Sequence, residues 1–383
     1  MTLRNKIEQE IREHGPMRFS RYMEMCLYDP EFGYYSREPE KFGKSGDFYT
    51  SSDVHAVFGR LLARQFEEIW RIMGSPATVE VRELGPGRGL FAQDVLEWSA
   101  RKFPEFFVAM HYALFERSPA LRAKIQSTLA PHLETGKASL QKERRASSPV
   151  TERNTSHESP LILFANEFFD AFPVEMVSDR GSLWIVFENG RLRETWAQPS
   201  EAELEFLDRY GVHPEPGERI EVPLAAMRYM NQLAAAVEKA VFVIVDYGYT
   251  RSEQLSGRHR GTLMTFRRHS AATDPYEAPG DQDITAHVNF TALAAAAEQN
   301  GMQVQPLVTQ SQFLLGIGES TQFADVFEDT RLPQERAKRA LQLKHLINPE
   351  GMGETFRVLV ASRGIDPAKF ARLSGLSFSK AQR

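Results

Sequence analysis

The chain has 383 residues, of which 42% are hydrophobic and 25% charged, so we expect a large core and either several domains or one domain with insertions. The formal net charge of −5 gives no electrostatic reason to expect nucleic-acid binding, and no stretch of the chain has the length of a membrane span. The single cysteine, Cys26, excludes an internal disulfide and a cysteine-based metal cluster.

Residues 1–75 are expected to form a mostly helical leader with a loop rich in aromatic residues and glycine. The first ten residues carry charges at helical spacing and have neither an apolar signal core nor the acid-poor composition of a transit peptide. We therefore expect a protein of the reducing cytoplasm. A segment before the first strand often lies across a cofactor pocket, which makes Gly46, Asp47 and Thr50 candidate cofactor contacts.

An alternating apolar run ends at Glu83 and is followed by glycines at every second position, Gly85, Gly87 and Gly89. Such glycines allow a sharp turn and bring backbone N–H groups close to a ligand. A dinucleotide loop needs its third glycine one residue later, where this chain has Leu90, so an NAD-dependent oxidoreductase ranks last. A carboxylate before the first glycine favours a cationic ligand, and S-adenosylmethionine (SAM) carries an ammonium and a sulfonium. Glu83, Gly85 and Gly87 are the SAM ligands that this pattern predicts.

A helix over 90–98 and a second strand over 111–116 are expected after the glycines. The strand ends in Glu116, and Ser118-Pro119 then opens another helix. Glu116 is placed to accept hydrogen bonds from both ribose hydroxyls of SAM. The alternative is a solvated carboxylate or a charge at the helix N-terminus.

Residues 135–158 are polar and are expected to be an exposed connection, and a buried strand is predicted over 161–165. The segment after that strand should hold the chemistry, because ligands of doubly wound sheets bind at the carboxyl ends of strands. The carbonyl of Asn166 can accept a hydrogen bond from a target N–H, and Asn166 is also a candidate SAM contact. Glu167 and Asp170 can orient a guanidinium and later receive its proton. Phe168 and Phe169 are candidate substrate contacts, with core packing as the alternative.

A hairpin is predicted over 182–197 around Asn189-Gly190, within a substrate-side insertion over 177–235. Further strands are expected over 241–248 and 261–266, and an alanine-rich helix after 283–290. His287 is a candidate substrate contact, although a lone histidine is more often structural. A helix and a last strand around 356–360 end the sheet.

These elements predict an α/β protein with the Rossmann-like class I SAM-dependent methyltransferase fold. We expect a mostly parallel seven-stranded sheet with a helical leader and an α+β insertion. The sheet would occupy residues 76–176 and 236–361, with residues 362–383 as a tail.

The chain resembles the MidA-like SAM-dependent methyltransferases from about residue 15 to 361. The resemblance rests on six motifs in this order: Gly46-Asp47-Phe48-Tyr49-Thr50-Ser51, Glu83-Leu84-Gly85-Pro86-Gly87-Arg88-Gly89, Asn166-Glu167-Phe168-Phe169-Asp170-Ala171-Phe172-Pro173, Asp246-Tyr247-Gly248, Asp283-Ile284-Thr285-Ala286-His287-Val288-Asn289-Phe290 and Asn348-Pro349-Glu350-Gly351-Met352-Gly353. Mitochondrial members of that family are protein arginine methyltransferases that assist assembly of respiratory complex I. The resemblance implies symmetric dimethylation of a protein arginine, with a complex I subunit as a candidate partner. Because no mitochondrial presequence is seen, we expect a bacterial cytoplasmic member of the family. A homodimer is a candidate assembly.

Met264 and Phe266 stand where the family usually has arginine and tyrosine, in its pattern Gly-Thr-Leu-Arg-x-Tyr-x-x-His. This difference bears on the methyl acceptor and not on SAM binding. Two alternatives stay open at this point. One is a small-molecule O- or N-methyltransferase, and the other is a non-catalytic scaffold that binds SAM.

Overall fold

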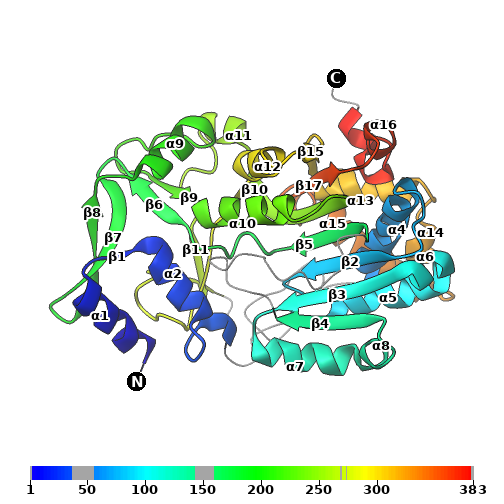
Figure 1. Cartoon of the computed structure of the whole chain (residues 1–383), viewed down its shortest axis with the longest axis horizontal. Helices are drawn as coiled ribbons and strands as arrows, with labels where there is room; N and C mark the ends of the chain where they lie inside the picture. Colours follow the sequence, from blue (N-terminus) through cyan, green and yellow to red (C-terminus); the bar gives the residue numbers. More distant parts are fainter. Residues whose placement is uncertain (1, 37–55, 143–158, 268–269, 273, 381–383) are drawn as a thin grey trace. The chain divides into compact units, whose positions relative to one another are not determined.

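The computed structural model describes residues 2–36, 56–142, 159–267, 270–272 and 274–380 (Figure 1). The chain forms two compact units. Unit 1 contains Met1–Phe48, Phe168–Asn231 and Gly248–Ala296, and unit 2 contains Tyr49–Glu167, Gln232–Tyr247 and Ala297–Arg383. Each unit has its own hydrophobic core.

Unit 2 is built on a sheet with the strand order β15-β17-β10-β5-β2-β3-β4. The five strands from β10 to β4 are parallel to their neighbours, and β17 is antiparallel to β10. Two short strands, β14 and β16, pair with β10 and β17 off this path. The strands of unit 2 are β2 (Val79–Leu84), β3 (Met110–Glu116), β4 (Ala138–Lys142), β5 (Leu161–Asn166), β10 (Ala240–Tyr249), β15 (Gln303–Val304), β16 (Val308–Thr309) and β17 (Phe356–Arg363). The strand β14 (Val288–Asn289) belongs to unit 1, where it pairs with Gly248 and Tyr249 at the end of β10. The predicted Rossmann-like, mostly parallel sheet is confirmed.

The helices of unit 2 follow the predicted strand–turn–helix order. The helix after β3 begins as expected, because the Ser118 hydroxyl accepts from the Leu121 N–H and Pro119 occupies the first turn. The helices are α4 (Ala56–Ile72), α5 (Leu90–Lys102), α6 (Pro104–Ala109), α7 (Pro119–Thr128), α8 (Ala130–Glu134), α13 (Gln310–Glu319), α14 (Ala324–Phe327), α15 (Pro333–Ile347), α16 (Pro367–Phe370) and the 3-10 helix η3 (Ser374–Lys380).

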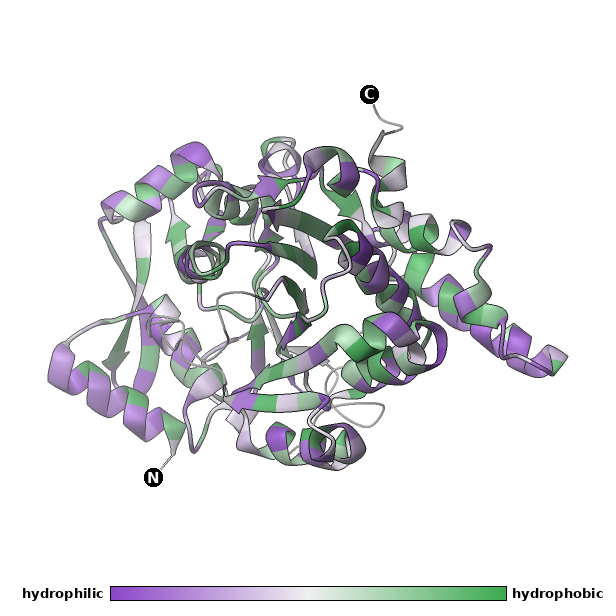
Figure 2. Ribbon diagram, turned by 45° about the vertical axis from the view of Figure 1, so that its right-hand side comes forward, coloured by the Kyte–Doolittle hydropathy of each residue, from purple (hydrophilic) through white to green (hydrophobic). Residues whose placement is uncertain are grey.

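The core of unit 2 joins one face of the sheet to α4 and α5. Phe91 of α5 stacks on Phe164 of β5 with ring centroids 4.4 Å apart, and Phe58 and Phe66 of α4 pack against both rings. The central strands are correspondingly hydrophobic along much of their length, as Figure 2 shows. This packing fixes β2 and β5 side by side in the middle of the sheet.

Unit 1 contains a sheet of order β1-β7-β6-β9 with β8 paired to β7, and a three-stranded sheet β12-β11-β13. Its strands are β1 (Met17–Arg18), β6 (Glu175–Ser178), β7 (Gly181–Glu188), β8 (Arg191–Ala197), β9 (Arg219–Val222), β11 (Met264–Arg267), β12 (Ser270–Ala272) and β13 (Asp283–Thr285). Its helices are α1 (Leu3–His14), α2 (Phe19–Tyr28), the 3-10 helix η1 (Tyr34–Ser36), α9 (Glu201–Arg209) and α11 (Arg251–Leu255), while α10 (Leu224–Ala235) and α12 (Phe290–Glu298) cross the division between the units.

The predicted β7–β8 hairpin is confirmed. Asn189 and Gly190 form its turn with φ of 50° and 76°, the left-handed pair that a type I′ turn requires. The N-terminal helices α1 and α2 pack on the same sheet, where Met17, Phe19 and Met23 join a core with residues of β6, β7 and β8. Cys26 is a buried free thiol in this core, where it packs as a small apolar residue.

Two local predictions need correction. Residues 138–142, expected to lie in an exposed connection, form β4, the edge strand parallel to β3. The strand is short and Leu140 is only partly buried, so it has no strong apolar alternation to reveal it. The strand expected over 261–266 begins only at Met264 and continues to Arg267.

Among the described residues, no helix is long and apolar enough to cross a membrane. The same residues contain no group of three or more histidine, cysteine, aspartate or glutamate side chains placed to hold a metal ion.

Candidate active site at the carboxyl ends of the parallel strands

The carboxyl ends of four neighbouring strands of unit 2 meet at one edge of the sheet. Leu84 of β2 lies opposite Phe115 of β3 and Ala165 of β5. The next residues of these strands, Gly85, Glu116 and Asn166, therefore lie at the same level. The chain continues from β2 to β3 on one side, while β5 lies on the other side, so this is the topological switch point where α/β sheets bind ligands.

The glycine turn connects β2 to α5 with all three glycines in the left-handed region, at φ of 64° for Gly85, 56° for Gly87 and 78° for Gly89. The Gly85 N–H donates to the Phe115 carbonyl at 3.1 Å, and the Gly89 N–H to the Pro86 carbonyl at 2.9 Å. A Cβ atom added at Gly87 would meet no atom of the described residues within 4 Å. Within that part of the chain the backbone at Gly87 borders open space, which suits close approach by a ligand.

Glu83 is almost completely buried, with 4% of its surface exposed. Its Oε2 accepts a hydrogen bond of 2.8 Å from the Tyr112 hydroxyl, and no hydrogen bond from the described residues reaches Oε1. Burial raises the pKa of Glu83 to about 8; the Tyr112 hydrogen bond acts in the opposite direction, and the charge of Glu116 adds to the rise. A buried carboxyl group of this kind would be stabilised in its ionised form by a cationic ligand.

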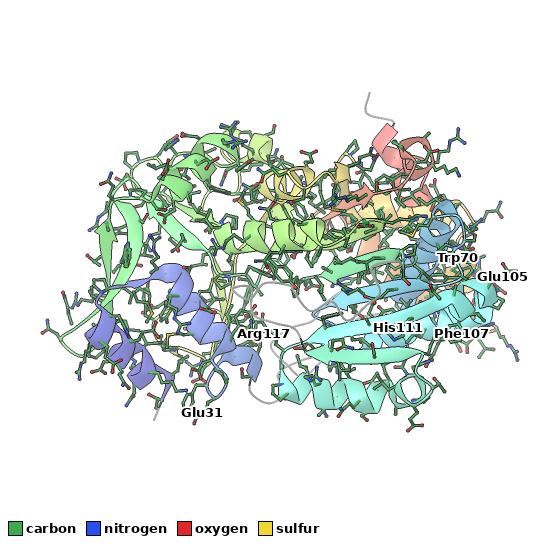
Figure 3. All side chains as sticks on the ribbon, viewed as in Figure 1. Glu31, Trp70, Glu105, Phe107, His111 and Arg117 are labelled. Atoms are coloured by element: carbon green, nitrogen blue, oxygen red, sulfur yellow. The ribbon has the colours of Figure 1, made fainter. Side chains whose placement is uncertain are left out.

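Glu116 ends β3, and Figure 3 labels the next residue, Arg117, just beyond that strand. The Glu116 Oε1 accepts a hydrogen bond of 2.8 Å from the Ser118 N–H, at the start of α7. Burial raises the pKa of Glu116 to about 7, while backbone N–H groups of Ser118 and Arg117 oppose the rise. Glu83 and Glu116 therefore form a pair of buried carboxyl groups on neighbouring strands.

Asn166 and Glu167 lie where β5 ends. The Asn166 Nδ2 donates to the Glu167 Oε1 at 3.1 Å, and the Asn166 Oδ1 is buried with no hydrogen-bond partner in the described part of the chain. The Glu167 N–H donates to the Val245 carbonyl at 3.0 Å, and Glu167 adopts φ of 49°. A left-handed glutamate is uncommon, and such backbone conformations concentrate at functional sites.

One further acid reaches the same edge. Asn166 lies opposite Val245 of β10, so Asp246 follows at this edge, with 0% of its surface exposed. Its Oδ1 accepts a hydrogen bond of 2.9 Å from the Tyr247 N–H. The sequence shows Asp246 at the carboxyl end of a strand predicted to be buried, but we did not predict a site role for this residue.

The remaining predicted site residues that the structure describes belong to unit 1. Phe169 is buried with Phe172 and Tyr229, whereas Phe168 is partly buried and packs edge-on against Phe169 and Phe172 at 5.3 Å. Asp170 is buried, and its carbonyl accepts from the Ala286 N–H at 3.0 Å.

His287 is partly buried in unit 1. Its backbone N–H donates to the Thr262 Oγ1 at 3.1 Å, and the centroid of its ring lies 5.6 Å from that of the His259 ring. Burial lowers the pKa of His287 to about 4, so the imidazole is neutral near pH 7. The predicted contacts Gly46, Asp47 and Thr50 lie outside the described residues.

Residues 61–308 match the family described as "Putative S-adenosyl-L-methionine-dependent methyltransferase". A crystal structure of a candidate methyl transferase from Burkholderia thailandensis, bound to S-adenosyl-homocysteine, is similar to this chain with a TM-score of 0.80 and 29% identity. The similarity covers 97% of this chain and 94% of that one.

Proteins named as mitochondrial protein arginine methyltransferases are also similar in sequence. The NDUFAF7 homolog of Drosophila melanogaster is 27% identical over 99% of this chain and 89% of its own length. The human protein arginine methyltransferase NDUFAF7 is 28% identical over 91% of this chain and 80% of its own length.

The fold and the glycine turn thus define a class I SAM-dependent methyltransferase, and the enzyme's cofactor is SAM. The chain belongs to the family of SAM-dependent methyltransferases whose model it matches, the MidA-like family that its motifs resemble. The site fits this cofactor, because the open Oε1 of Glu83, the buried Glu116 and the open space at Gly87 suit a ligand that carries both a cation and hydroxyl donors.

Replacing Gly87 by valine should abolish most cofactor binding. A Cβ here meets no described atom within 4 Å, so the new side chain would occupy the space into which the backbone opens, and the strain of a branched residue at φ of 56° is shared by the control. Gly136→Val is a matched control, because Gly136 has φ of 70°, similarly open surroundings and no place in the site. Thermal stabilisation by S-adenosylhomocysteine should be lost in Gly87→Val and retained in Gly136→Val. Equal stabilisation of the two variants would contradict a cofactor role for the turn.

Replacing Glu83 by glutamine should flatten the pH dependence of the stability of the ligand-free protein. The pKa of Glu83 rises from 4.5 to about 8 on folding, so between these values the folded protein holds a proton that the unfolded chain has released. The free energy of unfolding therefore falls as pH rises through this window, by at most about 1.4 kcal/mol per pH unit for one proton.

The measurement is the thermal midpoint by circular dichroism between about pH 5 and pH 8. It should fall less in Glu83→Gln than in the wild type or in the exposed control Glu134→Gln. A slope for Glu83→Gln equal to that of the wild type would show that Glu83 does not carry the pH dependence.

Proposed function

We propose that the enzyme transfers the methyl group of SAM to a guanidinium nitrogen of arginine in a protein, with symmetric dimethylation as the product. The proposal is supported by relatives named as protein arginine methyltransferases, which align with nearly the whole chain. The structural observation that carries it is the buried Oδ1 of Asn166, which has no hydrogen-bond partner in the described part of the chain. An acceptor atom buried in this way is suited to a donor that arrives with the substrate.

For the cofactor, we assign the ammonium to Glu83, the ribose hydroxyls to Glu116 and close backbone approach to Gly85 and Gly87. Glu83 offers its free Oε1 to the ammonium, and Glu116 keeps one oxygen on the Ser118 N–H. The predicted contacts Gly46, Asp47 and Thr50 remain part of the proposal.

For the methyl acceptor, Asn166 accepts a hydrogen bond from the target N–H and so directs the nitrogen lone pair. The Glu167 carboxylate, held by the Asn166 Nδ2 at 3.1 Å, pairs with the guanidinium and receives the proton that the nitrogen loses. The left-handed backbone of Glu167 is consistent with a side chain that is held in place for function. Asp170, Phe168, Phe169 and His287 remain candidates for contacts with the substrate.

SAM supplies a methyl group on a sulfonium, so the new C–N bond forms as the C–S bond breaks and its electron pair stays on sulfur. Positioning then does most of the catalytic work, because the displacement needs an in-line approach and no strong base. We assign this positioning to Asn166 and Glu167, which two neighbouring hydrogen bonds hold at the end of β5.

Replacing Asn166 by alanine should slow methyl transfer by about 10² while leaving binding of S-adenosylhomocysteine much less affected. The reason is that the variant removes the acceptor atom for the target N–H and leaves the glycine turn, Glu83 and Glu116 in place. Single-turnover methylation and calorimetric titration of each variant separate the two effects. Glu167→Gln is the paired variant, since it keeps the shape and the hydrogen bond but cannot take the proton. An Asn166→Ala enzyme with wild-type turnover would refute the assigned role.

The acceptor can be identified by incubating the enzyme with methyl-labelled SAM and a lysate of its host. We expect label in protein, and symmetric dimethylarginine after acid hydrolysis. Label that enters only small molecules, or that alkali removes from protein as an ester, would refute the arginine proposal and leave the methyltransferase assignment intact. The Asn166→Ala enzyme serves as the blank.

A further inference from the structure

Tyr112 and Glu83 form a buried hydrogen-bonded pair inside unit 2. The Tyr112 hydroxyl donates to the Glu83 Oε2 at 2.8 Å, and the two side chains are 0% and 4% exposed. The register of the parallel strands explains the contact. Val81 lies opposite Tyr112, so Tyr112 and Glu83 project from the same face of the sheet, and the long phenol side chain reaches along β2 to the carboxyl group two residues on.

The partner of Glu83 differs in kind from those of Asp325 and Asp329 in the same unit. Asp325 is held by Arg64 and by the Trp98 indole N–H, and Asp329 is held by both terminal nitrogens of Arg60. Glu83 has a neutral phenol instead of a cation. A phenol fixes one carboxylate oxygen in place but does not neutralise its charge, so the charge remains available to a ligand.

We propose that Tyr112 is a positioning residue for cofactor binding: its hydroxyl orients the Glu83 carboxylate and favours its ionised form, so that the free Oε1 is ready for the ammonium of the cofactor. This inference rests on the proposed function of Glu83. It adds a residue that makes no contact with the cofactor and acts through Glu83.

The charge state of Glu83 couples cofactor binding to proton release. The titratable groups that act on Glu83 are Tyr112 and Glu116, both on the adjacent strand. With a pKa of about 8, Glu83 is largely protonated at pH 7 in the ligand-free protein, and a bound cation must displace that proton. The Tyr112 hydrogen bond lowers the pKa of Glu83. Without that hydrogen bond Glu83 loses its proton only at a higher pH, and cofactor binding becomes tight only at that higher pH.

The test is Tyr112→Phe, which keeps the ring and removes only the hydroxyl. Calorimetric titration with S-adenosylhomocysteine, which retains the ammonium, is carried out between about pH 6 and pH 9. We expect affinity about tenfold weaker at pH 7, a difference that narrows toward pH 9, and a midpoint about one pH unit higher than in the wild type. Tyr22→Phe is the control, because Tyr22 is also buried and its hydroxyl donates to the Pro275 carbonyl at 2.6 Å in unit 1.

The double variant Glu83→Gln/Tyr112→Phe separates this inference from the proposed function. If Tyr112 acts through Glu83, the second change should add little to the loss caused by Glu83→Gln alone. An unchanged pH midpoint in Tyr112→Phe, or an equal loss with and without Glu83, would refute the positioning role. Wild-type affinity in Glu83→Gln alone would refute instead the assignment of the ammonium to Glu83.

Discussion

The site depends on two carboxyl groups that are buried at the carboxyl ends of neighbouring parallel strands. Glu83 and Glu116 lie on adjacent strands, are nearly inaccessible to solvent, and have pKa values that burial raises to about 8 and about 7. Such groups lower the stability of the ligand-free protein near neutral pH. A cationic ligand that pairs with the Glu83 carboxylate would remove that cost.

The local backbone around these acids departs from ordinary preferences in the same region. Three glycines in the left-handed region turn the chain from β2 into α5, and a left-handed glutamate follows β5. The glycines relieve the steric cost of their turn, whereas Glu167 has no such relief and depends on its surroundings, including its N–H bond to the Val245 carbonyl. Sequences usually keep local and global preferences in agreement, so the left-handed backbone of Glu167 beside these acids is consistent with a functional role.

The sequence was sufficient to predict the parts of the fold that carry strong local patterns. Continuous apolar runs identified β5 and β10, the glycine turn identified β2 and α5, and Asn189-Gly190 identified the hairpin. It did not reveal β4, whose pairing is set by the strand beside it, nor β1, whose two residues pair with β7 more than 160 positions away in the chain. The acids at strand ends were visible, but their burial and the Tyr112 hydrogen bond depend on the register of β2 and β3, which a single sequence does not encode locally.

The kind of residue that pairs with an acid distinguishes acids that stabilise the fold from acids that are placed to bind a ligand. Arg64 and Arg60 of α4 form ion pairs with Asp325 of α14 and with Asp329 just after it. These ion pairs neutralise the carboxylates and hold α14 against α4. Glu83 is paired with a neutral phenol instead, and we assign the missing cation to the cofactor. A buried carboxyl group with only neutral partners at the carboxyl edge of a parallel sheet is therefore a more specific sign of a cation site than a glycine-rich turn, which several classes of cofactor share.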